Sequence, residues 1–385
     1  MNFKFNKIFI DAAAVEDEIT KNVLSVYSEV PREIITNLHT FLENPSSISI
    51  SDGKKMLLLT HFKGNFLKPC PGTAESYRCC NYLVINESTN CPIDCTYCIL
   101  QTYINNPVIT VYTNVDLIIS ELQALSRLNS KRILRVGTGE LTDSLALDPI
   151  TGLSHKLIQN LPAFPNLLLE LKSKTDHIDH LLSESPERVV LSWSINPEAR
   201  IKSDEHKSSS LKKRMLAARK AMESGFLIGF HFDPIICAET EIDSYIRLVE
   251  QMSSYVDENR IAWISLGSLR FPPSLKPIIQ ERFPESKILT AESISGLDGK
   301  TRTIKPLRLM MYQEIVSAIR QRWGQVFIYF CMESQDIWEK VLQLSPADNL
   351  EVDWFFASSL YQRFTEFRFP KPEREIYHQP IRLHS

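Results

Sequence analysis

The sequence predicts an α/β protein built around a partial (β/α)6 barrel of the TIM type, with an N-terminal extension and a small C-terminal α+β region. Two observations predict this fold. Strand-like and helix-like segments alternate through the middle of the chain, and polar motifs follow successive strand-like segments. Strands separated by helices pair in parallel through right-handed crossovers. In an incomplete barrel of this kind, functional groups lie at the C-terminal ends of the strands.

Six segments have the apolar composition of buried strands, and helical patterns separate them. The expected strands are 81–88, 132–139, 167–173, 188–196, 226–234 and 260–268. The expected helices are 115–125, 155–161, 176–185, 209–225 and 241–254. The helix at 209–225 carries the clearest pattern, because it ends on Gly225, a glycine stop signal.

The remaining parts of the chain predict less regular units around this barrel. We expect an N-terminal extension at 1–78, the barrel at 79–270, a C-terminal α+β region at 271–350 and a tail at 351–385. Within the extension, 51–62 is expected to pack as an edge element. In the C-terminal region we expect helices at 307–323 and 336–344 and a strand at 326–333 with Cys331 in the core. The last residues are rich in proline and charge, which favours an extended or mobile tail.

Composition excludes several classes of protein. A net charge of -3 over 385 residues provides no overall basic field for nucleic acid, so any such surface is local. The N-terminus lacks an uninterrupted apolar signal region, and no stretch of about 18 apolar residues could span a membrane. Eight cysteines, three of them in a metal-binding pattern, favour a reducing compartment. We therefore expect a soluble cytoplasmic protein with no membrane partner.

The most specific motif is the C-x3-C-x2-C triplet formed by Cys91, Cys95 and Cys98, with no fourth cysteine close behind. Three thiolates at this spacing can bind three irons of a four-iron, four-sulfur (4Fe-4S) cluster. The fourth iron then has no local protein ligand, and an open metal position is typical of catalysis. A zinc site is the alternative, but the nearest histidines, His61 and His155, are far away in sequence. A thioredoxin-type pair is disfavoured by the additional cysteine.

Polar residues follow five of the expected strands in succession. The cysteines follow the first strand, and Gly137 to Glu140 (GTGE) end the second. Lys172 and Lys174 end the third strand, Ser194 and Asn196 the fourth, and His231 and Asp233 the fifth. Because the ends of parallel strands meet at one mouth of a barrel, this pattern predicts a binding cleft.

The cluster loop after a first strand, together with the GTGE strand end, resembles the radical S-adenosylmethionine superfamily. Longer stretches resemble the spore photoproduct lyase family within it, and these are 95–102, 173–182, 194–202 and 226–235. The resemblance covers roughly residues 80 to 270. It implies a 4Fe-4S cluster on the three cysteines and S-adenosylmethionine on the open iron. One electron from a reductant such as flavodoxin or ferredoxin would then cleave the cofactor to a 5′-deoxyadenosyl radical.

The resemblance also implies roles for residues at the strand ends. Gly137 and Gly139 would allow close approach of the methionine moiety, and Glu140 would meet its ammonium or the ribose. Lys174 matches the position that faces the methionine carboxylate, where a compact cation is suited. Ser194 and Asn196 match positions near the ribose. Tyr97, just before the last cysteine, matches a family tyrosine and is our candidate catalytic residue. The alternative for each is an ordinary surface or strand-end residue.

Two departures from the family concern the return of hydrogen to the product. The family's tyrosine directly after the last cluster cysteine is Ile99 here. Its hydrogen-donating cysteine after the second strand is replaced at or next to Leu141. We therefore expect radical generation without the family's relay, which puts repair of spore photoproduct itself in doubt. Cys79, Cys80 or Cys237 are substitute donors, unless they are ordinary small buried residues.

DNA is the candidate macromolecular partner. Residues 200–220 contain eight Lys or Arg against two acidic residues, and the Asp298-Gly299 turn has basic residues around it at 300–308. The family uses a C-terminal hairpin to open the duplex around a lesion, which suits a base that must leave the stack. A solvated basic face is the alternative. Three functions therefore remain, namely a photoproduct lyase, a radical enzyme for a peptide or small metabolite, and a non-catalytic iron-sulfur or zinc protein that binds nucleic acid.

Overall fold

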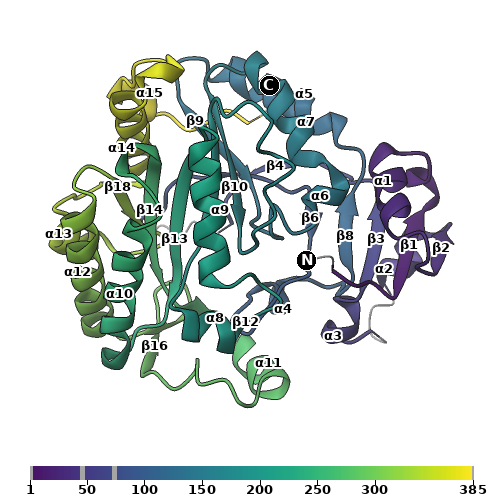
Figure 1. Ribbon diagram of the computed structural model, residues 1–385, viewed down its shortest axis with the longest axis horizontal. Helices are drawn as coiled ribbons and strands as arrows, with labels where there is room; N and C mark the ends of the chain where they lie inside the picture. The colour runs from purple at the N-terminus through teal and green to yellow at the C-terminus, as the bar shows by residue number, and fades with distance from the viewer. Residues whose placement is uncertain (1–2, 44–47, 72–75, 384–385) are drawn as a thin grey trace.

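The computed structural model describes residues 3–43, 48–71 and 76–383 (Figure 1). Its main sheet has eight strands in the order β18-β14-β13-β11-β10-β9-β5-β4 and curls into a half-barrel. The strands are β4 (Leu67–Pro69), β5 (Leu83–Ile85), β9 (Leu134–Thr138), β10 (Leu167–Ser173), β11 (Val189–Ser194), β13 (Leu227–Ile235), β14 (Ile261–Ser268) and β18 (Phe327–Phe330). All neighbours pair in parallel except β4, which is antiparallel to β5 at one edge.

The partial barrel and its six predicted strands are confirmed in the predicted order. These strands are apolar and buried along nearly their whole length; every residue of β14 is buried, for example. Strands covered on both faces need continuous apolar runs, which is the pattern that the sequence contains. The sheet also contains a seventh parallel strand, β18, which pairs with β14. From the sequence, 326–333 is expected to lie in a separate C-terminal region. In the structure, the long helix before this strand brings the chain back to the edge of the main sheet, so helix and strand add one more βα unit.

Four of the five helices predicted between these strands are confirmed. They are α5 (Asp116–Leu128), α7 (Leu153–Asn160), α9 (Leu211–Glu223) and α10 (Ile242–Ser253). Gly225 follows α9 with a positive φ of 89°, as its stop signal predicts. The helix predicted at 176–185 is wrong. Asp176 and His180 there bond to Ser209 and Asp148 on other segments, and the backbone forms turns instead.

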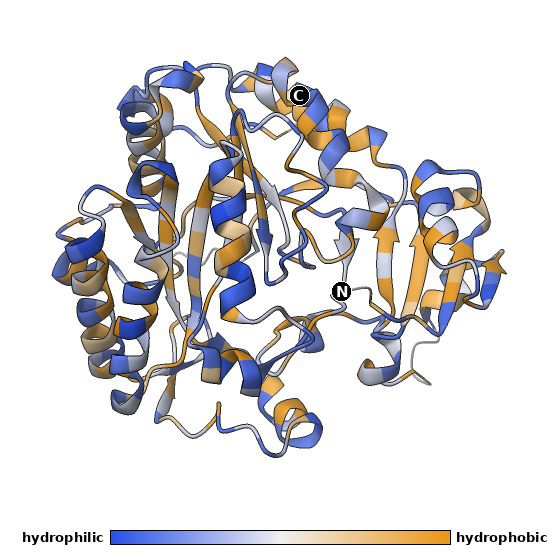
Figure 2. Ribbon diagram, viewed as in Figure 1, coloured by the Kyte–Doolittle hydropathy of each residue, from blue (hydrophilic) through white to orange (hydrophobic). Residues whose placement is uncertain are grey.

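The N-terminal part forms a second sheet in the order β2-β1-β3-β8-β6. Its strands are β1 (Lys7–Asp11), β2 (Arg32–Ile35), β3 (Met56–Thr60), β6 (Ser88–Thr89) and β8 (Ile109–Tyr112), and its helices are α1 (Glu18–Val26), α2 (Leu38–Glu43) and α3 (Ile50–Gly53). Figure 2 shows the apolar character of β1, β3 and β8. The expectation that 51–62 packs at an edge is wrong. Strand β3 is central, because β8 from beyond the cysteine loop pairs with its outer side.

The C-terminal segment packs against the main sheet, so the expectation of an extended or mobile tail is wrong for its described part. It contains α14 (Asn349–Arg363) and the short α15 (Arg374–Tyr377). The Tyr377 side chain is fully buried, and its hydroxyl accepts a hydrogen bond from the Ile133 amide at 2.8 Å. Arg132 donates to the Gln379 carbonyl and pairs with Asp353 at 2.6 Å. One aromatic anchor and one buried arginine therefore hold a segment whose composition favoured disorder.

The other elements include short helices, two helices beside α10 and β18, and two small sheets. The short helices are α4 (Leu100–Tyr103), α6 (Asp148–Thr151), α8 (Glu198–Asp204) and α11 (Leu275–Arg282), and the predicted helices at 307–323 and 336–344 are α12 (Lys305–Arg322) and α13 (Gln335–Leu342). A two-stranded ribbon joins β7 (Asp94–Cys95) to β12 (Glu205–His206). A three-stranded sheet contains β15 (Arg270–Phe271), β16 (Ser293–Ser295) and β17 (Thr301–Thr303). The predicted turn at Asp298-Gly299 joins β16 and β17. In the described part of the chain, no helix has the length and apolar character needed to cross a membrane.

Candidate active site

A cavity of about 310 Å³ lies at the C-terminal ends of the parallel strands. Its wall contains residues from the ends of β9, β10, β11, β13 and β14 and from the cysteine loop between β5 and β8. Of the predicted site residues, eight line it, namely Cys91, Cys95, Tyr97, Cys98, Gly139, Glu140, Lys174 and Ser194. The convergence predicted from successive strand ends is therefore confirmed for most of the set.

The three thiols sit on a loop that other side chains hold in place. Cys91 and Cys95 are 8% and 7% exposed, and Cys98 is partly buried. Gln101 donates from Nε2 to the carbonyls of Thr96 and Cys98 at 3.0 and 3.2 Å. Burial raises the pKa of the Cys91 thiol to about 12, so its thiolate form needs a nearby positive charge. Bound iron supplies such a charge.

This donor set fits a 4Fe-4S cluster better than a single ion. Within the described ranges of the chain, no three His, Cys, Asp or Glu side chains are grouped to hold one metal ion. A zinc site requires such a group, whereas a four-iron cluster binds each thiolate to a different iron. The thiols of Cys91, Cys95 and Cys98 all line one cavity, so three thiolates are available to such a cluster.

The predicted cofactor residues on the wall have distinct surroundings. Gly139 adopts a φ of +90°, and a Cβ there would lie 2.6 Å from the Ser144 hydroxyl, so the position requires glycine. Glu140 pairs with Lys172 at 3.9 Å. The Lys174 ammonium lies 5.9 Å from the centre of the Tyr97 ring. The cavity wall therefore contains both a negatively charged carboxylate and positively charged ammonium groups.

Gly137 and Asn196 do not line the cavity. A Cβ on Gly137 would lie 1.8 Å from the Tyr82 hydroxyl, so the glycine makes room for a buried tyrosine. Asn196 is buried, donates to Glu205 at 2.9 Å and accepts from the Tyr245 hydroxyl at 2.8 Å. Their placement indicates support of the wall, and direct contact with a cofactor remains a prediction for both.

A buried ion pair beneath the wall was not predicted. Arg214 on α9 and Glu205 on β12 are both fully buried, and Glu205 also accepts hydrogen bonds from Tyr97 and Asn196. Burial alone would raise the pKa of Glu205, but Arg214 and Lys174 outweigh it and hold the pKa at about 2. The Tyr97 hydroxyl is therefore fixed by a carboxylate while its ring faces the cavity. The sequence contained no sign of this pair beyond a basic helix.

The cavity floor carries a second group of charges. Glu170 on β10 accepts from His231 at 2.7 Å and lies 3.9 Å from Arg135. Burial opposes ionisation of Glu170, yet the contact with His231 and the charge of Arg135 hold its pKa at about 2. Asp233 forms a two-pronged ion pair with Arg270 at 3.1 and 3.2 Å. Among these residues, sequence reasoning identified His231 and Asp233, which lie in the C-terminal half of β13, and missed Glu170, Arg135 and Arg270.

The two positions that depart from the family, Ile99 and Leu141, both line the cavity. So do Cys70, Cys79, Cys80 and Cys331, whereas Cys237 lies outside it. The expectation of an ordinary core position for Cys331 is wrong. It directly follows β18 and accepts a hydrogen bond from Arg270 at 3.1 Å, because the seventh strand ends at the same mouth as the others.

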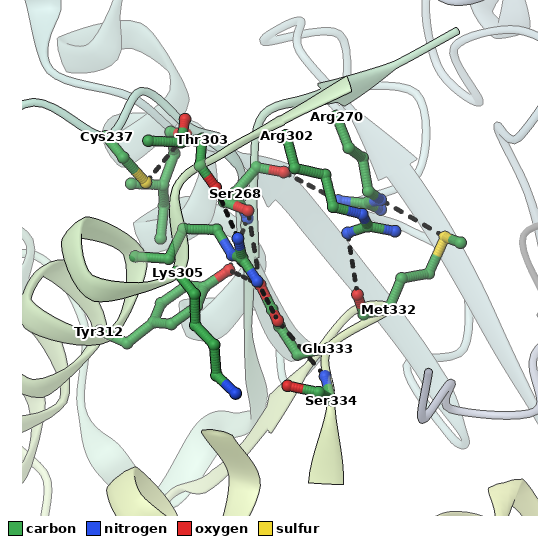
Figure 3. A network of polar contacts seen from close by, with 12 residues as sticks. Cys237, Ser268, Arg270, Arg302, Thr303, Lys305, Tyr312, Met332, Glu333 and Ser334 are labelled. Atoms are coloured by element: carbon green, nitrogen blue, oxygen red, sulfur yellow. Dashed lines mark hydrogen bonds and ion pairs between the residues drawn. The ribbon is translucent and has the colours of Figure 1, made fainter. Parts of the chain in front are cut away.

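The β16–β17 hairpin is tied to the edge of the cavity by a buried polar network (Figure 3). Glu333, after β18, accepts from Arg308 at 2.8 and 3.2 Å and from the Tyr312 hydroxyl at 2.9 Å. Arg302 on β17 donates to the Met332 carbonyl at 3.1 Å and pairs with Asp298 in the turn at 2.6 Å. Beyond this anchor, the tip residue Leu297 is 82% exposed.

A half-barrel of parallel strands with three thiols at its open end defines an enzyme of the radical S-adenosylmethionine superfamily. The family model described as spore photoproduct lyase matches residues 73–304, more than half of the chain. The chain belongs to the spore photoproduct lyase family.

Curated relatives and solved structures agree with this assignment. The spore photoproduct lyase of Geobacillus sp. (strain Y412MC61) is 28% identical over 210 residues, which cover 54% of this chain and 62% of the relative. That of Bacillus subtilis (strain 168) is 27% identical over 284 residues, covering 72% and 75%. A solved spore photoproduct lyase complexed with dinucleoside spore photoproduct matches with a TM-score of 0.74 at 21% identity, over 86% of this chain and 100% of that one. This structural likeness concerns the fold alone.

Proposed function

We propose that this protein is a radical S-adenosylmethionine lyase of the carbon-carbon class that acts on a pyrimidine photoproduct in DNA. One observation carries the proposal: the three cluster thiols share a single cavity with the residues expected to bind S-adenosylmethionine. Support comes from relatives named spore photoproduct lyase and from a related variant solved with bound S-adenosylmethionine and dinucleoside spore photoproduct.

In this proposal Cys91, Cys95 and Cys98 hold the cluster as thiolates. When bound, the cluster would supply one electron to cleave S-adenosylmethionine into methionine and a 5′-deoxyadenosyl radical, which would remove hydrogen from the substrate. Lys174 and Glu140 would orient the charged methionine end, and the Ser194 hydroxyl would contact the ribose. The Tyr97 ring forms part of the wall that excludes water from the reacting groups.

The substrate radical requires one hydrogen atom, and we propose Cys331 as its source. The thiyl radical left on Cys331 would take one electron from the reductant and one proton from solvent to restore the thiol. A hydrogen-atom donor must keep its S–H bond, so a protonated thiol is needed. Contact with Cys79 and the charge of Arg135 lower the pKa of Cys80 to about 6, which favours its thiolate. Burial raises the pKa of Cys331 well above its usual value, although Arg270 opposes the shift, so this thiol stays protonated. Cys79 also keeps its proton, because contacts with Cys70 and Cys80 and burial raise its pKa well above the usual value. Cys331 is preferred because it is partly exposed, whereas Cys79 is only 1% exposed.

A low-potential one-electron carrier such as flavodoxin or ferredoxin would supply the reducing electron. We also infer a cytoplasmic location, because an iron-sulfur centre suits a reducing compartment. A second candidate function, a radical enzyme acting on another substrate, is favoured by Ile99 and Leu141 on the cavity wall.

The test is anaerobic reconstitution followed by reaction with ultraviolet-irradiated DNA. We expect cleavage of S-adenosylmethionine and restoration of thymines by the wild type and by Cys237→Ala, whose cysteine lies outside the cavity. Cys91→Ala should abolish both reactions. Cys331→Ser should retain cofactor cleavage but change the products, while Leu141→Cys in that background should restore thymine. Cofactor cleavage without any effect on irradiated DNA would contradict the proposed substrate and support the second candidate.

A further inference from the structure

The N-terminal unit places a buried lysine directly against the cysteine loop. Lys54 follows α3 and is 4% exposed. Its ammonium donates hydrogen bonds to the backbone carbonyls of Cys91 and Ile93, both at 2.8 Å. Asp94 of the same loop lies 3.7 Å away. One side chain therefore contacts three of four consecutive loop residues, two through hydrogen bonds and one through charge.

This arrangement leaves uncompensated positive charge beside the loop. Burying an ammonium is costly unless a carboxylate and hydrogen bonds offset the loss of water. The carboxylate near Lys54 is Asp94, and Arg282 on α11 already binds both of its oxygens, at 3.0 and 3.1 Å. Two cations therefore share one carboxylate, and the remaining partners of Lys54 are neutral carbonyls.

Close packing of the backbone allows the lysine to reach the loop. A Cβ on Gly53 would lie 2.3 Å from the Pro107 carbonyl oxygen, so only glycine permits this approach. Asn90, the residue before Cys91, donates to the same Pro107 carbonyl at 2.5 Å. The turn after α3 and the start of the cysteine loop therefore both pack against the Pro107 carbonyl, which keeps them close together.

We propose that Lys54 is a positioning residue of the iron-sulfur site, through which the N-terminal unit becomes part of the redox centre. Its hydrogen bonds fix the carbonyls of Cys91 and Ile93 and so direct the Cys91 thiol toward the cavity. Its charge favours the reduced, more negative state of a bound cluster, because opposite charges attract strongly where water is excluded. The inference rests on the proposed function only for the identity of the bound group.

The experiment compares Lys54→Met and Lys54→Arg with Lys55→Met in the reconstituted full-length protein, without DNA. Lys55 is adjacent, exposed and paired with Asp52, so its loss removes the same charge away from the loop. We measure the midpoint potential by a redox titration followed by electron paramagnetic resonance, and the rate of iron loss to a chelator. K54M should shift the potential to more negative values and release iron about 10-fold faster, as outer partners of metal ligands typically do when removed. K55M should match the wild type.

The Arg variant separates charge from geometry. K54R keeps the charge but changes the hydrogen bonds, so it should lose iron faster than the wild type while its potential shifts less than that of K54M. If K54M does not fold, K54R alone tests the inference. The inference would be overturned if the folded Lys54 variants had the same midpoint potential and the same rate of iron loss as the wild type. It would also be overturned if lower thermal stability were the only change in these variants. If the wild type binds no four-iron cluster, the proposed function fails instead. Failure to repair DNA leaves the inference intact.

Discussion

Glu205 and Arg214 form an ion pair, 2.5 Å between Oε2 and Nη2, that is fully shielded from solvent beneath the cavity. Through Tyr97 and Asn196, the same carboxylate joins the cysteine loop to the end of β11. A buried charge that loses its partner is strongly destabilising, whereas replacement of both partners by apolar groups often is not. The pair therefore stabilises the site only as a complete unit.

Arg214→Met should lower the free energy of unfolding by about 3–5 kcal/mol, because Glu205 is left buried without a counter-charge. Adding Glu205→Leu to this variant should recover part of the loss. Lys213→Met is the control on the same helix, since Lys213 is half exposed, and should change the free energy by less than about 0.5 kcal/mol. Urea unfolding at neutral pH provides the measurement. Equal stability of the single and double variants would contradict this account.

Glu87 should make stability depend on pH. Burial, together with the charges of Asp148 and Asp143, raises the pKa of Glu87 to about 8 in the folded protein. A carboxyl with a raised pKa favours the fold while protonated, so its contribution is lost as pH rises from about 4.5 to about 8. Glu87→Gln should therefore gain stability relative to the wild type across this window and show a constant difference above it. Urea unfolding at several pH values checks the trend, and a difference independent of pH would refute it.

Gly137→Ala should destabilise the protein by about 1–3 kcal/mol or more, as overpacking of a core does. The added Cβ would lie 1.8 Å from the Tyr82 hydroxyl and 2.5 Å from the Glu170 carbonyl oxygen. Moving the Glu170 backbone to relieve this clash would cost free energy because it would distort β10. Gly324→Ala is a matched control, because a Cβ at that position would meet no atom within 4 Å. Thermal unfolding of both variants tests the difference. If the two are equally stable, Tyr82 moves more freely than its burial indicates.

Leu297→Ser should leave stability within about 0.5 kcal/mol of the wild type, because the side chain is 82% exposed. If the hairpin opens the duplex around a lesion, this variant should act more slowly on irradiated duplex DNA and normally on the free dinucleotide. Leu117→Ser, half exposed on α5, is the control and should affect neither substrate. An equal loss on both substrates would show that Leu297 acts on the chemistry instead of on the duplex.

Local patterns in the sequence determined the half-barrel and the metal-binding loop. Alternating apolar strands and amphipathic helices predicted the order of six parallel strands, and the spacing of Cys91, Cys95 and Cys98 predicted the ligands. Both signals lie within short segments, where composition and spacing directly reflect burial or ligand geometry. The convergence of strand ends followed from the general rule for parallel sheets.

Tertiary structure alone decided which distant residues complete the site. Lys54 contacts a loop 37 positions further along the chain, and Arg270 reaches Cys331 across 61 positions. Strand β8 pairs with β3 in the N-terminal sheet, and β18 pairs with β14 in the main sheet. The residues around β8 and β18 in the sequence did not indicate either pairing. Such contacts depend on how the chain packs, and a lone buried lysine or a cysteine after a short strand carries no periodic signal. The sequence therefore predicted the cysteine ligands, while packing selected the charges and thiols around them.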